Sequence, residues 1–391
     1  WNGRQRLVVG LAASQIATEV LTGEGLPARN ITRWLATQQR IADGQPVADD
    51  RAWRLNTGDL VVVDESAMAN TPDLTAIREY VAAAGAKLLL VGDHRQLAAV
   101  GAGGGMGLVA DIGIRHELVE VRRFTNEWEA EASLRLREGD EAALADYRKH
   151  GRIIDAGAVE QAEAAASRAY LGDTLAGLHS LLICDTNEQA ARISAQARAE
   201  LVRLGRVQDA GVPLGLQGTV AGVGDLVQAR LNGWQLAGYQ GNRRGPINRE
   251  LYRVIETHAD GSLLVAPLLG RSAEGDQLGP RIGLPAAYVA DHVALGYATT
   301  VHSAQGLTVD TSHTVATSRT GAAAQYVAIT RGRHANTAYV TTKAIPDDSP
   351  PGVTNQVQHR DPLAVLGAAY ERTTEDLAAL AEADTSHAET E

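Results

Sequence analysis

One short segment constrains the fold of this chain more than any other. Four apolar residues, Leu60 to Val63, run directly into two carboxylates, Asp64 and Glu65. An apolar run of this kind is typical of a buried parallel strand. In open α/β sheets, the carboxyl ends of the strands face the ligand crevice. The segment therefore predicts a parallel α/β sheet with two acids at its ligand-binding edge.

The flanking sequence repeats an alternation of strands and helices. Residues 6–14 predict a strand that leads into a helix over 15–21, and a predicted helix over 74–84 precedes a strand over 87–93. A second strand-and-helix series occupies 179–201. Such alternation favours parallel sheets, so the predicted fold class is α/β with two parallel-sheet cores.

A different pattern separates the parts of the second core. Between about 208 and 290 the chain is rich in glycine and in short alternating apolar runs, which predicts a small inserted β barrel or sheet. Asp260-Gly261 is its hairpin signal, since both central residues of the favoured turn must accept a positive φ.

The expected organisation therefore has four regions. These are a first core over 1–150, a second core over 151–207 and 291–345, the β insertion over 208–290, and a C-terminal region over 346–391. The last region predicts one helix near 362–382 and a disordered end of about eight residues.

Composition excludes several classes of protein. No apolar run approaches the ~20 residues that a membrane-spanning helix needs, so no membrane insertion is expected. The single cysteine, Cys184, excludes an internal disulfide and fits a reducing cytoplasm. The net charge of −11 argues against a surface coated for non-specific DNA binding, although a motor can confine its cations to a channel.

The acids have a specific chemical interpretation. Asp64 could hold a Mg²⁺ ion through water, and Glu65 could orient an attacking water. Asp93 and Gln96 follow the next predicted strand, where a glutamine amide could touch both a γ-phosphate and the nucleophilic water. The alternative is an ordinary strand-end loop with solvated acids followed by a polar turn.

The second half of the chain contains further candidates. His302 and Ser303 lie between a predicted strand and helix, and Gly306 would allow close approach of the backbone. Arg331 and Arg123 could stabilise charge on a transferring phosphoryl group, Arg331 as an arginine finger. The alternatives are a core histidine, a surface salt bridge and a solvated arginine.

Two polar residues after predicted strands could contact a nucleic-acid backbone. Ser14 and Asn187 can hydrogen-bond phosphate oxygens without reading bases, or they could simply cap helices. Four tryptophans could stack on bases, although core packing is their commoner role: Trp34, Trp53, Trp128 and Trp234.

Six ordered segments together resemble a known family. LAAS at 11–14, VVDESAM at 62–68, VGDHRQL at 91–97, VRRF at 121–124, VHSAQGLTVD at 301–310 and YVAITRGR at 326–333 look like motifs Ia, II, III, IV, V and VI of superfamily 1 helicases. The RecD-like branch fits best. Over roughly 6–345 the amino-acid sequence is similar to the helicase part of conjugative relaxases of the TraA/TrwC type.

The resemblance implies an ATP- and Mg²⁺-dependent motor that moves 5′-to-3′ on single-stranded DNA. Its two cores would be RecA-like, with a shared nucleotide cleft, and its β insertion SH3-like. The implied roles are Mg²⁺ binding for Asp64, water activation for Glu65, γ-phosphate contact for Gln96, Arg123 and Arg331, nucleotide contact for Gly306 and Asp93, and DNA contact for Ser14, Asn187, His302 and Ser303.

One departure from the family pattern matters. No G-x-x-x-x-G-K-[ST] phosphate loop occurs in the 391 residues, and the family places it just before motif Ia. We therefore expect a fragment that does not hydrolyse ATP alone, within a parent protein that does and that could carry a relaxase domain in the same polypeptide. The alternatives are a non-catalytic nucleic-acid-binding or assembly module and the motor subunit of a recombination-repair nuclease.

Overall fold

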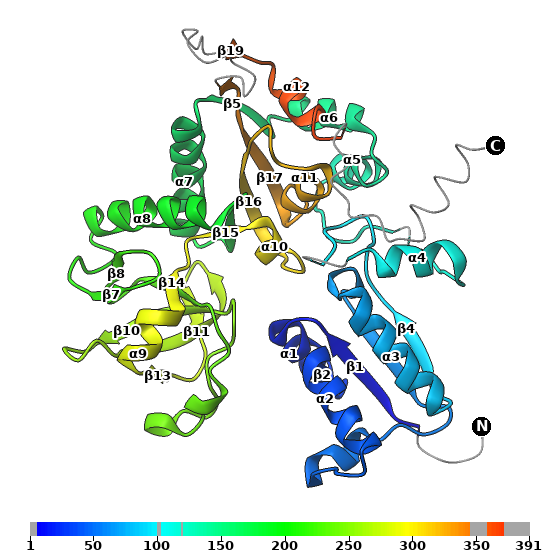
Figure 1. Cartoon of the computed structure of the whole chain (residues 1–391). Coiled ribbons are helices and arrows are strands. Elements are labelled where there is room, and N and C mark those ends of the chain that lie inside the picture. Colours follow the sequence, from blue (N-terminus) through cyan, green and yellow to red (C-terminus); the bar gives the residue numbers. More distant parts are fainter. Residues whose placement is uncertain (1–5, 100–102, 119, 345–357, 371–391) are drawn as a thin grey trace, which may run out of the picture. The chain divides into compact units, whose positions relative to one another are not determined.

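The structure is a computed structural model that describes residues 6–99, 103–118, 120–344 and 358–370. It divides into two compact units, which are described separately below. The first contains the described residues up to 118, and the second contains those from 120 onward (Figure 1). The expected disordered end lies outside the described residues.

A four-stranded parallel sheet forms the centre of the first unit. Its order is β2 (Ala28–Asn30), β1 (Val8–Ala12), β3 (Leu60–Asp64) and β4 (Lys87–Leu90). Ala12 lies opposite Asp64, and Val63 lies opposite Leu90. Since all pairs are parallel, the four strands end at one edge of the sheet. Val61 and Val63 are fully buried, whereas Leu60 and Val62 are half-buried, so β3 is less enclosed than its apolar run predicts.

Helices follow the strands of this unit, and two of them lie where the sequence predicts helices, over 15–21 and 74–84. They are α1 (Gln15–Gly23), α2 (Ile31–Ala42), α3 (Thr71–Ala83) and α4 (Gly105–Ile112), with short 3₁₀ turns η1 (Ala48–Trp53) and η2 (Ser66–Met68). Ser14 caps α1, because its Oγ accepts the N–H of Ala17 at 3.1 Å. Asn30 caps α2 in the same way through the N–H of Thr32 at 3.0 Å.

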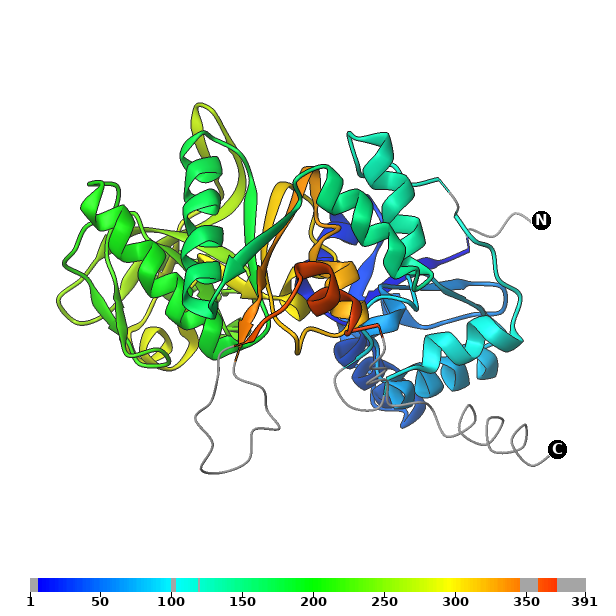
Figure 2. The ribbon, with the colours of Figure 1, turned by 90° about the horizontal axis from the view of Figure 1, so that it is seen from above.

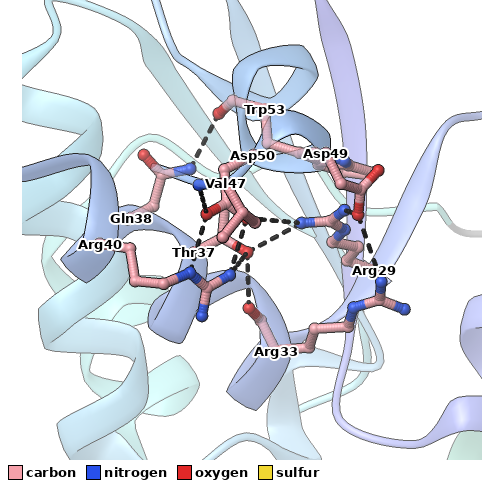
Figure 3. A network of polar contacts seen from close by, with 9 residues as sticks. All are labelled: Arg29, Arg33, Thr37, Gln38, Arg40, Val47, Asp49, Asp50 and Trp53. Atoms are coloured by element: carbon pink, nitrogen blue, oxygen red, sulfur yellow. Dashed lines mark hydrogen bonds and ion pairs between the residues drawn. The ribbon is translucent and has the colours of Figure 1, made fainter. Parts of the chain in front are cut away.

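A polar network fastens η1 to α2 (Figure 3). Asp50 is 1% exposed and accepts two hydrogen bonds from Arg40, at 2.8 and 2.7 Å, and one from the N–H of Val47 at 3.1 Å. The hydrogen bond from Arg40 lowers the pKa of Asp50 to about 2. Arg29 pairs with Asp49 and lies over the Trp53 ring, 4.2 Å from its centroid. The contacts of this buried acid are therefore structural, since they hold η1 against α2.

A five-stranded parallel sheet forms the centre of the second unit. Its order is β15 (Ala298–Thr300), β6 (Ser180–Cys184), β16 (Val309–Ala316), β17 (Gly332–Thr341) and β5 (Ile153–Gly157). The helices of this sheet are α7 (Val159–Leu175), α8 (Asn187–Arg203), α10 (Val301–Ala304) and α11 (Ala322–Ala328). Figure 2 shows α7 alongside the sheet, where it contacts β5, β6, β16 and β17.

Two helices that precede this sheet in the sequence and one that follows it pack with the sheet. The elements are α5 (Glu127–Arg137), η3 (Glu141–Ala143), α6 (Leu144–Lys149), the C-terminal α12 (Pro362–Gly367) and the short pair β18 (Lys343–Ala344) and β19 (Gln358–His359). Leu136 and Tyr147 share an apolar cluster with Val340 and Leu366. Residues from 120 to 149 thus group with the second unit, while the domain boundaries drawn from the sequence stay predictions.

An antiparallel β subdomain is inserted between β6 and β15, as the sequence predicts. Its main sheet runs β12 (Gly275–Leu278), β11 (Leu263–Ser272), β10 (Leu251–Thr257), β9 (Leu226–Ala229) and β14 (Val293–Leu295), with β13 (Ile282–Leu284) on β11. The remaining elements are the hairpin β7 (Val212–Leu214) and β8 (Thr219–Ala221), the turns η4 (Trp234–Leu236) and η5 (Tyr239–Gly241), and α9 (Ala286–His292). Two parallel sheets and one antiparallel subdomain confirm the predicted α/β fold class.

The hairpin turn between β10 and β11 differs from the prediction. Gly261 has a φ of +88°, but Asp260 is not among the described residues with positive φ. The loop spans the five residues between Thr257 and Leu263 rather than two. Asp260 instead accepts hydrogen bonds from the N–H and the hydroxyl of Ser262, at 2.9 and 2.7 Å. The aspartate therefore acts through its side chain and not through a left-handed backbone.

Candidate functional site

The carboxyl edge of the first sheet gathers the candidate residues of that unit. Ser14 follows β1, Asp64 ends β3, and Asp93 follows β4, on neighbouring strands in the order β1-β3-β4. The Asn30 amide at the end of β2 donates to the carbonyl of Ala13 at 2.8 Å, which ties β2 to the same edge. The sheet thus presents Ser14, the adjacent acids Asp64 and Glu65, and the Asp93 turn along one edge.

Glu65 has an unusual backbone conformation for a glutamate. Its φ and ψ are 47° and 42°, which is the left-handed region that favours glycine. The next residue fixes this bend, because the N–H and the hydroxyl of Ser66 both donate to the carbonyl of Val91 at 2.9 Å. Gly92 permits this approach, since a Cβ there would lie 3.0 Å from the Ser66 nitrogen. Strained residues of this kind are concentrated at ligand sites.

The turn after β4 holds Gln96 in place. Asp93 accepts the N–H of Arg95 at 3.1 Å and the side-chain amide of Gln96 at 3.3 Å. The amide oxygen of Gln96 is buried and has no hydrogen-bond partner among the described residues. A buried acceptor without a donor costs about 1–3 kcal/mol. A bound water would satisfy it, which suits the predicted contact of Gln96 with a nucleophilic water.

The second sheet divides its candidates between its two edges. At the amino edge, Gly306 lies just before β16 and Arg331 lies just before β17, and Val309 N–H donates to the Arg331 carbonyl at 3.1 Å. Arg123 joins them from far away in the sequence, since its guanidinium donates to the carbonyl of Thr330 at 2.6 Å. The structure therefore brings Arg123 and Arg331 together within one unit.

Arg331 is buried rather than exposed. Only 1% of the residue is accessible, and its guanidinium donates to the Val327 carbonyl at 2.8 Å and to the Thr330 hydroxyl at 3.0 Å. A role on phosphate stays a prediction for this residue. Its present contacts also hold the end of α11 against the start of β17.

The carboxyl edge of the second sheet carries three of the four residues predicted to contact DNA. Asn187 begins α8 after β6, and His302 and Ser303 lie in α10 after β15. The Thr300 hydroxyl donates to Ser303 at 3.2 Å. Burial, and then the nearby Arg249, lowers the pKa of His302.

Of the two helix caps considered from sequence, only one is found. Ser14 caps α1, but α8 is capped by Thr186, whose hydroxyl accepts the N–H of Gln189 at 3.1 Å. Asn187 is the first helical residue, and its amide oxygen instead accepts a hydrogen bond from Arg230 at 2.9 Å. Asn187 is therefore linked to the β subdomain rather than to its own helix.

Sequence reasoning missed a half-buried acid beside this edge. Asp185 accepts hydrogen bonds from the hydroxyls of Thr317 and Thr320, at 2.9 and 2.8 Å, and burial raises its pKa. These residues meet because β6 and β16 are neighbours in the sheet. No local pattern could have joined them, since they are 132 and 135 residues apart.

The tryptophans differ in accessibility. Trp34 is fully buried, Trp53 lies under Arg29, and Trp128 stacks on the ring of His150 with centroids 3.9 Å apart. Trp234, in contrast, is 52% exposed. Only Trp234 of these four thus offers an open ring.

Two kinds of feature are absent from the described residues. None of their helices is both long enough and apolar enough to cross a membrane. They also contain no group of three or more histidine, cysteine, aspartate or glutamate side chains arranged to hold a metal ion. Mg²⁺ binding by Asp64 stays a prediction.

Comparison with known proteins gives consistent matches. Residues 1–158 match the family model described as an AAA domain. The probable conjugal transfer protein TraA of Sinorhizobium fredii (strain NBRC 101917 / NGR234) is 29% identical over 341 residues, which are 85% of this chain and 28% of that protein. TraA of Rhizobium radiobacter is also 29% identical, over 86% of this chain and 28% of its own length. The chain thus spans little more than a quarter of these relatives.

Two solved structures share a similar course of the chain at low sequence identity. Pif1 helicase from Bacteroides, in complex with ADP-AlF3 and ssDNA, is 16% identical over 87% of this chain and 83% of its own, with a TM-score of 0.48. Pif1 helicase from Candida albicans is 14% identical over 86% and 84%, with a TM-score of 0.48.

Proposed function

We propose that this chain is the motor part of an ATP-dependent DNA translocase. It is a distant relative of the TraA conjugal transfer proteins and carries a RecD- or Pif1-like superfamily 1 helicase domain. The motor would move 5′-to-3′ on single-stranded DNA within a conjugative relaxase. ATP and Mg²⁺ are the proposed cofactors, and single-stranded DNA is the proposed partner. A cytoplasmic location stays a prediction.

The arrangement at the end of β3 carries this proposal. Asp64 and Glu65 are adjacent at one edge of the sheet. Gln96 lies after the neighbouring strand β4, and its buried amide oxygen has no hydrogen-bond donor among the described residues. A nucleotide hydrolase needs one acid for Mg²⁺, one for the attacking water and a polar side chain that senses the γ-phosphate. A fold-retaining binding module would not require a glutamate held in a strained conformation.

The second unit supports the proposal independently. Arg123 and Arg331 meet at the amino edge of its sheet, where their guanidinium groups could serve a nucleotide. Asn187, His302 and Ser303 are grouped near the carboxyl edge, where uncharged donors could contact a phosphodiester backbone. Two edges with different chemistry fit an enzyme that must handle two ligands.

The test is ATP hydrolysis by the whole gene product, with and without single-stranded DNA, for Glu65→Gln beside the unchanged protein. Loss of a general base typically costs 10²–10⁴-fold, so we expect a drop of about that size in kcat with DNA binding retained. Glu79→Gln, on the exposed face of α3, is the matched control and should hydrolyse ATP normally. Equal rates for Glu65→Gln and Glu79→Gln would contradict the proposal.

One observation favours a second candidate function. The 391 residues contain no G-x-x-x-x-G-K-[ST] loop, so this chain by itself should not hydrolyse ATP. Tight binding of single-stranded DNA by a whole gene product that also lacks ATP hydrolysis would favour a non-catalytic DNA-binding or assembly module. Robust hydrolysis by the 391 residues alone would refute the expected dependence on the phosphate loop.

A further inference from the structure

Two arginines of the β subdomain lie beside each other where that subdomain meets the second sheet. Arg230 directly follows β9, and Arg249 precedes β10, its antiparallel neighbour. Arg230 donates to the amide oxygen of Asn187 at 2.9 Å, and Arg249 donates to the carbonyl of His302 at 3.5 Å. Both guanidinium groups thus extend from the subdomain to the carboxyl edge of the sheet.

Neither arginine forms an ion pair with an acid in the part of the chain that the structure describes. Among the described residues, their hydrogen-bond acceptors are all uncharged: the side chains of Gln228 and Asn187 for Arg230, and a backbone carbonyl for Arg249. Burial, and then the positive charge of Arg230, lowers the pKa of Arg249. Two cations held this close repel each other, and an anionic ligand would relieve the repulsion.

The backbone at Arg249 is strained in a way that fixes this geometry. Its φ is +71°, which is uncommon for a side chain of this size. The N–H of Arg249 donates to the Ala229 carbonyl at 2.7 Å, and its own carbonyl accepts the Gln228 amide at 3.1 Å. Strain held by surrounding contacts is characteristic of ligand sites. Here it directs a cation toward α10.

We infer that Arg230 and Arg249 bind two phosphates of a single nucleic-acid strand that runs along this edge. The inference rests on the proposed function and adds a contribution from the β subdomain to strand binding. Guanidinium groups suit phosphate oxygens, and the neighbouring Asn187 and His302 supply uncharged polar groups. The exposed Trp234 ring lies on the same segment as Arg230 and could stack on a base, which a free phosphate would not need.

Salt dependence of binding tests this inference. Binding of a fluorescent oligothymidylate to the 391-residue chain is measured by anisotropy over a range of salt concentrations, for the unchanged chain and for Arg230→Gln/Arg249→Gln. Each phosphate contact on a single strand contributes about 0.7 to the slope of log K against log salt. We therefore expect the slope of the double variant to fall by about 1.4, with weaker binding at low salt.

Matched variants separate charge from folding. Arg230→Lys/Arg249→Lys should keep most of the slope, and Arg203→Gln, at the far end of α8, should keep all of it. Arg249→Gly relieves the left-handed strain, so it should bind DNA less well without a lower Tm. Addition of ATP to the bound oligonucleotide distinguishes a strand-binding site from a nucleotide-binding site. ATP should not displace the oligonucleotide if the arginines bind a strand.

The outcomes are distinguishable. A double variant with unchanged slope and affinity would overturn the role of the two arginines while leaving the motor proposal intact. Displacement of the oligonucleotide by ATP from the unchanged chain, but not from the double variant, would also overturn it, in favour of a nucleotide site. An unchanged chain that does not bind single-stranded DNA at all would contradict both this inference and the proposed function.

Discussion

The two parallel sheets of this chain use the same architecture in different ways. The first sheet places Ser14, Asp64, Glu65 and Asp93 along its carboxyl edge alone. The second sheet uses both edges, with Arg331 beside the amino ends and Asn187 beside the carboxyl ends. The first therefore gathers its acids and its strained glutamate at one edge, whereas the second places Arg331 and Asn187 at opposite edges.

The difference shows that topology alone does not decide where a sheet carries its chemistry. In open α/β sheets, ligands usually bind at the carboxyl edge, and the candidate residues of the first sheet lie at that edge. The amino edge of the second sheet gains its candidate residues from contacts that cross the chain, such as the hydrogen bond from Arg123 to the carbonyl of Thr330. Four substitutions test how far the two sheets differ.

The largest effect is expected at the amino edge of the second sheet. If Arg331 acts as an arginine finger, Arg331→Gln should lower DNA-stimulated ATP hydrolysis by the whole gene product by about 10³-fold or more. Arg333→Gln is the control, since that side chain is 52% exposed two residues away. Circular dichroism must show a folded variant, because Arg331 also supports α11. A folded Arg331→Gln protein with normal turnover would leave this edge purely structural.

A structural acid of the first unit should give the largest change in stability. Asp50→Asn removes the charge that Arg40 holds in a buried network, and a fall in Tm of about 5 °C or more at pH 7 is expected. The pKa of Asp50 is lowered to about 2, so its contribution is full above its unfolded pKa and is lost as pH falls toward 2. Calorimetry at pH 7 and pH 3 checks this. An equal loss at both pH values would exclude the charge as the cause.

Relief of backbone strain should give a smaller change of opposite sign. Asparagine tolerates the left-handed region better than glutamate, so Glu65→Asn should raise the free energy of unfolding by about 1 kcal/mol. The same variant should lose hydrolysis in the whole gene product. Urea titration beside Glu79→Asn, in the regular helix α3, checks the stability. A destabilised Glu65→Asn would show that the glutamate is held by favourable contacts and not by strain.

The smallest effect is expected from a buried acid of the second unit. Glu129 is fully buried and accepts the Asn336 amide at 2.8 Å, and burial raises its pKa. Its contribution to stability is therefore present below its unfolded pKa and is lost as pH rises through the folded value. Glu129→Gln should raise Tm at pH 8 by about 2–4 °C, if the relief is ~1 kcal/mol, and have little effect near pH 4. A gain that is equal at both pH values would contradict this assignment.

Local patterns were sufficient to predict the fold class. The run from Leu60 to Val63 predicted β3, and the 15–21 segment predicted α1, because strand and helix periodicity are properties of neighbouring residues. The β insertion was predicted from its glycine-rich alternation. The hairpin turn was mispredicted, because the side-chain hydrogen bonds of Asp260 open a wider loop than the Asp-Gly pair favours.

The candidate site was predictable only where its residues adjoin strand ends. Asp64, Glu65 and Gln96 follow apolar runs, so their position on one edge could be anticipated. The pairing of Arg230 with Arg249 depends on the register of β9 and β10, which places Leu251 opposite Gln228. The strained φ of Glu65 depends on Ser66 and Val91. Neither the proximity of the two arginines nor the φ of Glu65 could be predicted from residues adjacent in the sequence.

The insertion of the β subdomain has a consequence for the order of folding. Strands β6 and β15 are neighbours in the sheet, yet the contact between Cys184 and Thr299 joins residues 115 positions apart. Closing an unstructured loop of that length costs about 4 kcal/mol in chain entropy. Pairing of β14 with β9 draws the ends of the subdomain together and removes most of that cost. We therefore expect the subdomain to fold first and the edge strand β15 to pair with β6 afterwards. The folded insertion would then bring the two parts of the second core together.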